Sequence, residues 1–104
     1  MNPIGKVFII SWGTPVEKET RNRIHLAAAA YAYEIENDPI MSDAVFDKMA
    51  LDIDLSIETT NPAMDEYFKK YFEPFTGQWI HHHPDKEGLA KVAARLRSGK
   101  VYID

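Results

Sequence analysis

Aromatic and acidic residues lie on both sides of a proline-bearing break in this chain. Tyr33 precedes the segment Asn37-Asp38-Pro39, and Asp43, Phe46 and Asp47 follow it. A cationic aromatic ring is attracted to the face of another ring and to a nearby carboxylate. These residue types could therefore bind a small aromatic cation, provided that the fold brings the two sides of the break together.

The stretch Tyr31-x-Tyr33, Pro39 and Asp43-x-x-Phe46-Asp47 matches a known pattern in register. Over about residues 24–64 the chain resembles the N-terminal helical subdomain that binds nicotinamide mononucleotide (NMN) in bacterial NAD-dependent DNA ligases. The resemblance implies that Tyr33 is a platform for the pyridinium ring and that Phe46 is a second aromatic contact. It further implies that Asp43 and Asp47 accept hydrogen bonds from the ligand, that NMN or NAD is the ligand, and that the protein is of a phage or prophage type.

Two positions depart from the family pattern. Glu34 replaces a histidine, and a carboxylate there would repel the phosphate of a ligand. By its position Glu34 is still a candidate ligand-binding residue, together with Tyr33, Asp43, Phe46 and Asp47. Phe46 replaces a tyrosine, which keeps the ring and removes the hydroxyl. The 104 residues also lack the Lys-x-Asp-Gly nucleophile motif of the family's adenylation domain. We therefore expect the chain not to be a ligase by itself, and more generally not to be an enzyme.

Three consecutive histidines form a second unusual segment. In an extended chain His81 and His83 would face one way and His82 the other. Neutral imidazole is a common zinc ligand, so a metal-dependent enzyme around His81 and His83 is one hypothesis. Such a site would need a further ligand, for example His25 or Asp85. The alternative is a polar loop before the last helix.

A run of aromatic residues precedes the histidines. Core packing is the favoured interpretation, and a surface for a protein partner is the alternative, because a small domain cannot bury every ring. The candidates for that surface are Tyr67, Tyr71, Phe75 and Trp79.

Four helices are predicted to position these residues. Thr14-Pro15-Val16-Glu17 is a capping box with a proline at the first helical position. Ser42 caps a second helix, whose apolar face runs from Phe46 to Ile57. Asn61-Pro62 starts a third helix, and Pro84 opens a fourth. The apolar face predicted for the first helix is Val16, Thr20, Ile24, Ala27, Tyr31 and Ile35.

Short strands are predicted at both ends, over residues 6–12 and 100–103, and we expect them to pair. The predicted fold class is therefore mainly α (α+β), with about four helices and short N-terminal and C-terminal strands. Because the chain has only 104 residues, a single domain spanning 1–104 is expected.

Charge and composition limit the classes of partner. The net charge of −4 argues against direct contact with nucleic acid. The chain has no cysteine, and its first apolar run, residues 7–10, is too short to span a membrane. A cytoplasmic location follows as the expectation, with an unidentified protein or a second copy as the partner.

These observations lead to an ordered set of hypotheses. The first is a non-catalytic binding or accessory module, built on a ligase-like helical hairpin, that acts through protein–protein contacts and needs no cofactor. The first alternative is an NMN- or NAD-binding protein that uses Tyr33, Asp43, Phe46 and Asp47. The second alternative is the metal-dependent enzyme around His81 and His83.

Overall fold

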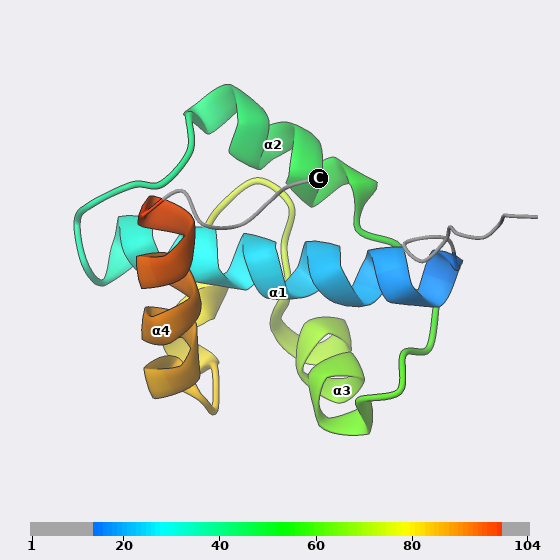
Figure 1. Ribbon diagram of the computed structural model, residues 1–104. Helices are drawn as coiled ribbons and strands as arrows, with labels where there is room; N and C mark the ends of the chain where they lie inside the picture. Colours follow the sequence, from blue (N-terminus) through cyan, green and yellow to red (C-terminus); the bar gives the residue numbers. More distant parts are fainter. Residues whose placement is uncertain (1–13, 99–104) are drawn as a thin grey trace, which may run out of the picture.

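The protein is mainly helical (Figure 1). The computed structural model describes residues 14–98, and it forms no strand within that range. The predicted strands at 6–12 and 100–103 lie outside the described residues. No helix of the described part is both long and apolar enough to cross a membrane. The elements are α1 (Pro15–Glu34), α2 (Asp43–Asp52), α3 (Pro62–Tyr71), the 3₁₀ helix η2 (Gln78–His82) and α4 (Lys86–Arg97).

Side-chain caps start the first three helices where the sequence predicts. The Thr14 hydroxyl accepts the Glu17 N–H at 3.0 Å, and the Glu17 carboxylate accepts the Thr14 N–H at 3.4 Å, which completes the capping box. Ser42 caps α2 and Asn61 caps α3 in the same way. Each cap satisfies a backbone N–H that has no partner inside its helix.

The predicted break after α1 is also confirmed. The helix ends at Glu34, and Asn37 adopts a left-handed φ of 55°. The Asp38 N–H turns back and donates to the Ala32 carbonyl at 2.8 Å. Asparagine tolerates this conformation better than most residues, so the turn forms where the sequence contains Asn37.

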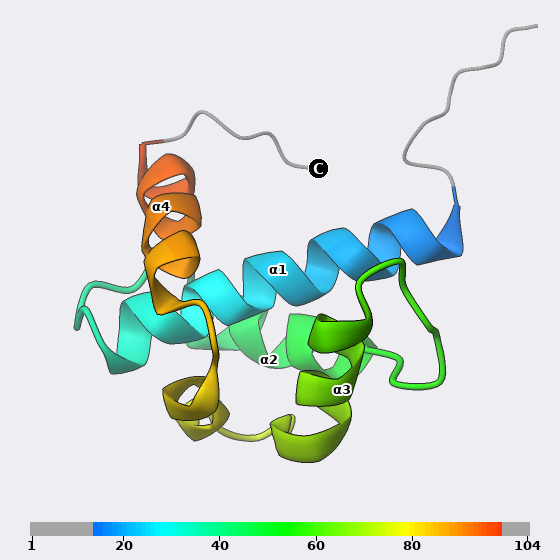
Figure 2. The ribbon, with the colours of Figure 1, turned by 90° about the horizontal axis from the view of Figure 1, so that it is seen from below.

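The long helix α1 runs through the middle of the molecule. Both views show α4 crossing it near its C-terminal end, with α2 along one side and α3 near its N-terminal half (Figures 1 and 2). The four alanines 27–30 allow neighbours to approach closely on more than one side. One core cluster combines Leu26, Ala27 and Ala30 with Phe68, Trp79 and Ile80. A smaller cluster joins Ala28 and Ala32 to Ala93 of α4.

The apolar face predicted for α1 is partly wrong. Ile24 and Ile35, both assigned to the core, are exposed. Glu19 and Arg23, one helical turn apart, are buried instead. The helix is rotated from the expected orientation because these two charged side chains hold a set of buried polar contacts.

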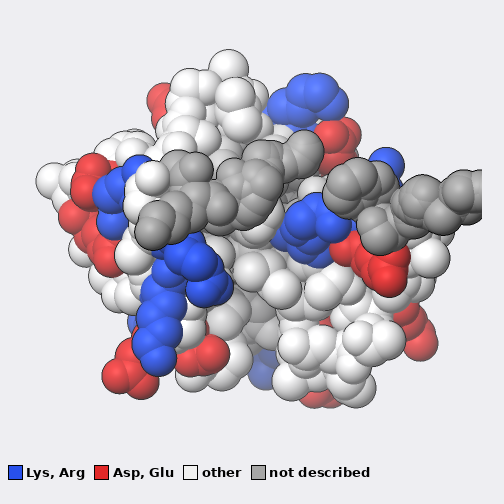
Figure 3. All heavy atoms as spheres, viewed as in Figure 1, with Lys and Arg blue, Asp and Glu red and all other residues white. Residues whose placement is uncertain are grey.

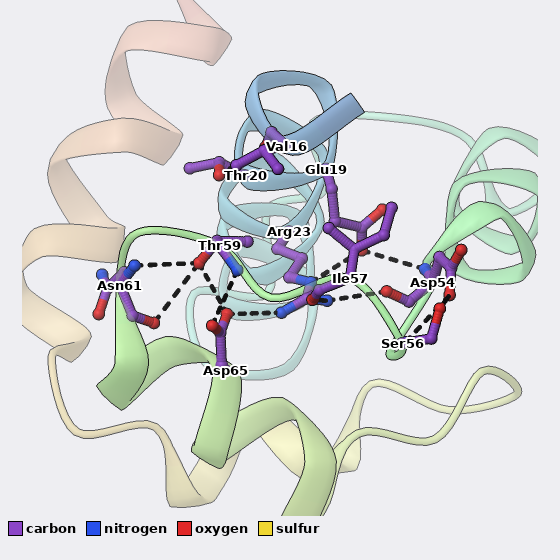
Figure 4. A network of polar contacts seen from close by, with 10 residues as sticks. All are labelled: Val16, Glu19, Thr20, Arg23, Asp54, Ser56, Ile57, Thr59, Asn61 and Asp65. Carbon is purple, nitrogen blue, oxygen red and sulfur yellow. Dashed lines mark hydrogen bonds and ion pairs between the residues drawn. The ribbon is translucent and has the colours of Figure 1, made fainter. Parts of the chain in front are cut away.

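Arg23 is the centre of that set of contacts (Figure 4). Its Nε donates to Glu19 Oε2 at 2.7 Å, and its Nη1 donates to Asp65 Oδ1 of α3 at 2.9 Å. Its Nη2 donates to the backbone carbonyls of Asp54 and Ile57, each at 2.9 Å. We call Glu19, Arg23 and Asp65 the buried triad. It fixes α1, α3 and the loop between α2 and α3 to one another.

The buried triad also explains why α2 is shorter than predicted. The helix ends at Asp52, and Ile53 has an extended ψ of 130°, whereas the sequence predicts an apolar helical face as far as Ile57. Beyond the helix, the Asp54 N–H donates to Glu19 Oε2 at 3.0 Å. Backbone groups of this loop are satisfied by side chains of α1, so they do not need helical partners.

The last helix begins slightly later than predicted. Asp85, rather than Pro84, stands before its first turn, and its carboxylate accepts the Gly88 N–H at 3.0 Å. Before it, the first two residues of the histidine segment, for which a polar loop is the alternative prediction, lie instead in η2. The C-terminal residue of α4, Arg97, pairs with Glu36 at 2.7 Å and with Asp38 at 3.0 Å. On the face shown in Figure 3, basic side chains over α4 lie beside acidic side chains at the end of α1.

Candidate functional site

A pocket of about 220 Å³ lies between the C-terminal half of α1, the start of α2 and the loop before η2. Tyr33, Asp43, Phe46 and Asp47 all line it, so the structure brings together four of the five residues predicted to bind a ligand, and the fifth, Glu34, is not in the lining. The full lining is Ala29, Tyr33, Pro39, Ile40, Met41, Asp43, Phe46, Asp47, Phe75, Thr76 and Gly77.

The aromatic side chains of the pocket differ in exposure. Tyr33 is 54% exposed, and Phe75 is 82% exposed. Phe46 is partly buried and packs against the main core cluster. The pocket therefore has one ring anchored in the core and two rings with surface available to a ligand.

Phe75 is a pocket residue that the resemblance does not provide. It belongs to the loop between α3 and η2, and the sequence marks it only as a candidate surface for a protein partner. Gly77 of the same loop comes close to α1, because a Cβ built on it would lie 3.6 Å from the Cβ of Ala30. In the sequence, the only sign of this arrangement is an aromatic residue two positions before a glycine. That pattern is too common to identify a pocket residue.

The two carboxylates of the pocket come from one face of α2. Asp43 and Asp47 are four residues apart, which places them on adjacent turns of the same helical face. Both are exposed, and neither pairs with another of residues 14–98. Both are therefore available to a cationic group or a hydrogen-bond donor of a ligand.

Glu34 is not among the residues that line the pocket. Its side chain lies against Gly77, where a Cβ would come within 3.3 Å of Glu34 Cγ. Its Oε1 accepts a hydrogen bond from Gln78 Nε2 at 3.3 Å and lies 3.8 Å from His81 Nε2. Glu34 thus connects the end of α1 to η2, while its carboxylate stays close behind one wall of the pocket.

The three histidines have separate surroundings. His81 lies beside Glu34, and the ring of His82 stacks on Tyr71 with centroids 4.4 Å apart. Within residues 14–98 there is no group of three His, Cys, Asp or Glu side chains that could hold a metal ion. His81 and His83 are therefore not joined by a third described ligand, and the metal hypothesis finds no geometry that favours it.

His83 is half-buried against the edge of Tyr67, with ring centroids 4.9 Å apart. Its Nδ1 accepts the Asp85 N–H at 3.0 Å, so this nitrogen carries no proton. Burial lowers the pKa of His83, although the Asp85 carboxylate acts in the opposite direction. The burial and the accepting Nδ1 both favour the neutral imidazole beside the start of α4.

The candidate partner surface divides into core and exposed residues. Tyr67 and Trp79 are only 6% and 3% exposed, and the Tyr67 hydroxyl donates to the Trp79 carbonyl. These two residues belong to the core, so assigning them to a surface is wrong. Tyr71 is half-buried, which leaves Phe75 as the exposed ring of the four.

No model of a known protein family matches the chain, and neither a curated protein nor a solved structure matches it. The resemblance to the ligase subdomain stays a prediction. Any function has to be inferred from the residues of the pocket and their surroundings.

Proposed function

We propose that this protein is a binding module that holds a small aromatic cation of the nicotinamide nucleotide class in the pocket. The observation that carries the proposal is the common location of Tyr33, Asp43, Phe46 and Asp47 around one cavity. These residues are separated in sequence by a turn. They come together because the turn reverses the chain, so that α2 packs alongside α1.

The chemistry of the lining supports a cationic ring. Tyr33, Phe46 and Phe75 offer ring faces and edges to a planar ligand, and a cation gains further from a ring face. Asp43 and Asp47 add two carboxylates with no partner among the described residues. A pyridinium ring that carries a carboxamide combines the charge, the shape and the hydrogen-bond donor that this lining could recognise.

The size of the pocket limits how much of a ligand it encloses. Sites for drug-sized ligands have volumes of roughly 300–1,000 Å³, and this pocket has about 220 Å³. We therefore expect one ring, with part of its sugar, to enter the pocket. The rest of a nucleotide would lie at the opening, in contact with solvent.

Neighbouring contacts hold the walls of the pocket in place. Arg97 pairs with Glu36 and Asp38, directly before the lining residues 39–41. Ser42 caps the helix that carries both aspartates, with its hydroxyl 3.2 Å from the Val45 nitrogen. A site that is formed before its ligand arrives loses less entropy on binding.

Titration of the ¹⁵N-labelled full chain with NMN and with NAD tests the proposal. We expect amide shifts concentrated at the pocket lining, and weaker binding in Tyr33→Ala and Asp47→Asn. Asp52→Asn is the matched control, because it removes the same charge from α2 outside the pocket. The absence of shifts at millimolar ligand would refute the proposal.

A second candidate, contact with another protein, is favoured by the exposure of Phe75. The Phe75 side chain is 82% exposed, and aromatic residues are enriched in the cores of protein–protein interfaces. Light scattering coupled to gel filtration tests self-association through this residue. A mass that rises with concentration in the native chain, but not in Phe75→Ser, would support it. A monomer at every concentration would exclude it.

A further inference from the structure

Every charged side chain that lines the pocket is a carboxylate. Asp43 and Asp47 face it from α2, and the described part of the chain contributes no Lys, Arg or His to the lining. The Glu34 carboxylate adds negative charge close behind Gly77. A phosphate brought to the opening of this pocket would meet repulsion that no described residue of the lining offsets.

Among residues 14–98, two positive features adjoin the segments that line the pocket: the N-terminus of α2 and the guanidinium of Arg97. The N-terminus of α2 would ordinarily attract an anion. Here the Ser42 hydroxyl accepts the Val45 N–H, and the Asp43 carboxylate occupies the first turn. The guanidinium of Arg97 is paired with Glu36 and Asp38. The charge of Arg97 is therefore neutralised by two carboxylates, and the positive end of α2 is opposed by the Asp43 carboxylate.

From this balance of charges we infer that the pocket selects the unphosphorylated cation. Nicotinamide riboside should bind more tightly than NMN, which has the same ring and sugar with a 5′-phosphate added. The phosphate brings about −1.5 to −2 charges, so it turns a cationic ligand into an anionic one. This inference rests on the proposed function and specifies the ligand class of the same site.

The selectivity should come from charge and not from shape. Because the pocket of about 220 Å³ has room for little more than the ring, the phosphate would lie outside it, within reach of the field of the carboxylates. At 4 Å in water the interaction of two unit charges corresponds to about a fivefold change in affinity, and both the phosphate and the lining carry more than one charge. We therefore expect nicotinamide riboside to bind on the order of tenfold more tightly than NMN at low salt, with a smaller difference at high salt.

Isothermal titration of the full chain with nicotinamide riboside and with NMN, at low and at high salt, measures this difference. Asp47→Asn should reduce the preference for the riboside, since it removes one pocket carboxylate. Asp52→Asn lowers the negative charge of the chain equally but lies outside the pocket, so it should leave most of the preference in place.

The possible outcomes separate the inference from the proposed function. Tighter binding of the riboside that weakens with salt and with Asp47→Asn supports the inference. Equal or tighter binding of NMN overturns it and leaves the proposed nicotinamide site standing. A preference that Asp52→Asn reduces as much as Asp47→Asn also overturns it, because the net charge of the chain would then be the cause. If neither compound binds, the proposed function fails, and the inference fails with it.

Discussion

Arg23 and Asp65 meet inside the protein, although 42 positions separate them in the sequence. Arg23 Nη1 donates to Asp65 Oδ1 at 2.9 Å, and Glu19 holds the Nε of the same guanidinium. Asp65 is held in turn by the hydroxyl of Thr59 at 2.7 Å. A guanidinium removed from water needs such partners for its donors, and two loop carbonyls bring the number of Arg23 hydrogen bonds to four.

Replacing Arg23 with methionine should be strongly destabilising. The variant keeps much of the side-chain volume but leaves Glu19 and Asp65 as buried carboxylates without their cation. It also leaves the Asp54 and Ile57 carbonyls without their donor. Breaking a buried ion pair costs about 3–5 kcal/mol, so we expect a loss of that order in the free energy of unfolding. Urea denaturation followed by circular dichroism measures it.

Arg21→Met provides the matched control on the same helix. Arg21 is two positions away, is only half-buried and has no partner in the buried triad. A substitution of this kind usually changes stability by no more than about 0.5 kcal/mol. If Arg23→Met and Arg21→Met lowered the free energy of unfolding by the same amount, the buried triad would not be a source of stability.

The starts of helices could be predicted from the sequence because they depend on local chemistry. Each cap accepts a hydrogen bond from a backbone N–H only three residues away. The capping residues are Thr14, Ser42 and Asn61. The break at Asn37 is local in the same sense, because it depends on the backbone preferences of Asn37 and Pro39. No knowledge of the tertiary structure is needed for any of them.

The buried face of α1 and the end of α2 depend on contacts that the sequence does not reveal. Charged residues normally face solvent, so Glu19 and Arg23 are assigned to the surface by any pattern of hydrophobicity. Their burial requires Asp65 and the carbonyls of the loop that follows α2. Because these partners lie at least 31 residues from Arg23, no local spacing connects them.

The residues of the candidate pocket also differ in whether they could be predicted from local sequence. Tyr33, Asp43, Phe46 and Asp47 fall within fifteen residues, so a short motif can group them. Phe75 joins them only because α3 and its following loop return to α1. In the sequence, Glu34 stands directly after Tyr33 and is therefore grouped with the ligand-binding candidates. In the structure, its carboxylate contacts Gln78 and His81 and so points toward η2.

Arg97→Gln should loosen the turn that leads into the pocket. The native guanidinium pairs with Glu36 and Asp38 and donates to the Asp38 carbonyl at 2.9 Å. Without it we expect faster hydrogen exchange at the Asp38 amide, which donates to the Ala32 carbonyl in the folded turn. Nuclear magnetic resonance measures this rate. Arg95→Gln, from the same last turn of α4, should leave it unchanged, and equal rates in the native chain and Arg97→Gln would contradict the prediction.

Tyr67→Phe should destabilise the core without changing its shape. The Tyr67 hydroxyl donates to the Trp79 carbonyl, and both residues are buried. The Trp79 carbonyl belongs to the 3₁₀ helix η2 and keeps its backbone partner there, so the variant loses one hydrogen bond, which is worth about 0.5–1.5 kcal/mol. Thermal and urea unfolding measure the loss. Tyr71→Phe is the comparison, because Tyr71 is half-buried on the same helix and no hydrogen bond of its hydroxyl is found among the described residues. If Tyr71→Phe lowered the free energy of unfolding as much as Tyr67→Phe, the Tyr67 hydrogen bond could not explain the loss.

His83 should make the fold less stable in acid. Burial lowers the pKa of His83 in the folded state, and its Nδ1 must be unprotonated to accept the Asp85 N–H. The unfolded chain, with a histidine pKa near about 6.5, therefore takes up a proton at higher pH than the folded chain does. The contribution of His83 to stability is complete above about pH 6.5 and is lost as the pH falls toward the lower pKa of the folded state.

His83→Asn tests this dependence, since the amide oxygen of asparagine can accept the Asp85 N–H without titrating. We expect the native chain to lose more free energy of unfolding than His83→Asn when the pH is lowered from about 7.5 to about 5.5, because only the native residue gains a proton on unfolding in that window. Urea denaturation of both chains at the two pH values measures the difference. An identical loss in the two chains would mean that His83 keeps its ordinary proton affinity in the folded state, and that its contacts with Tyr67 and Asp85 impose no preference for the neutral ring.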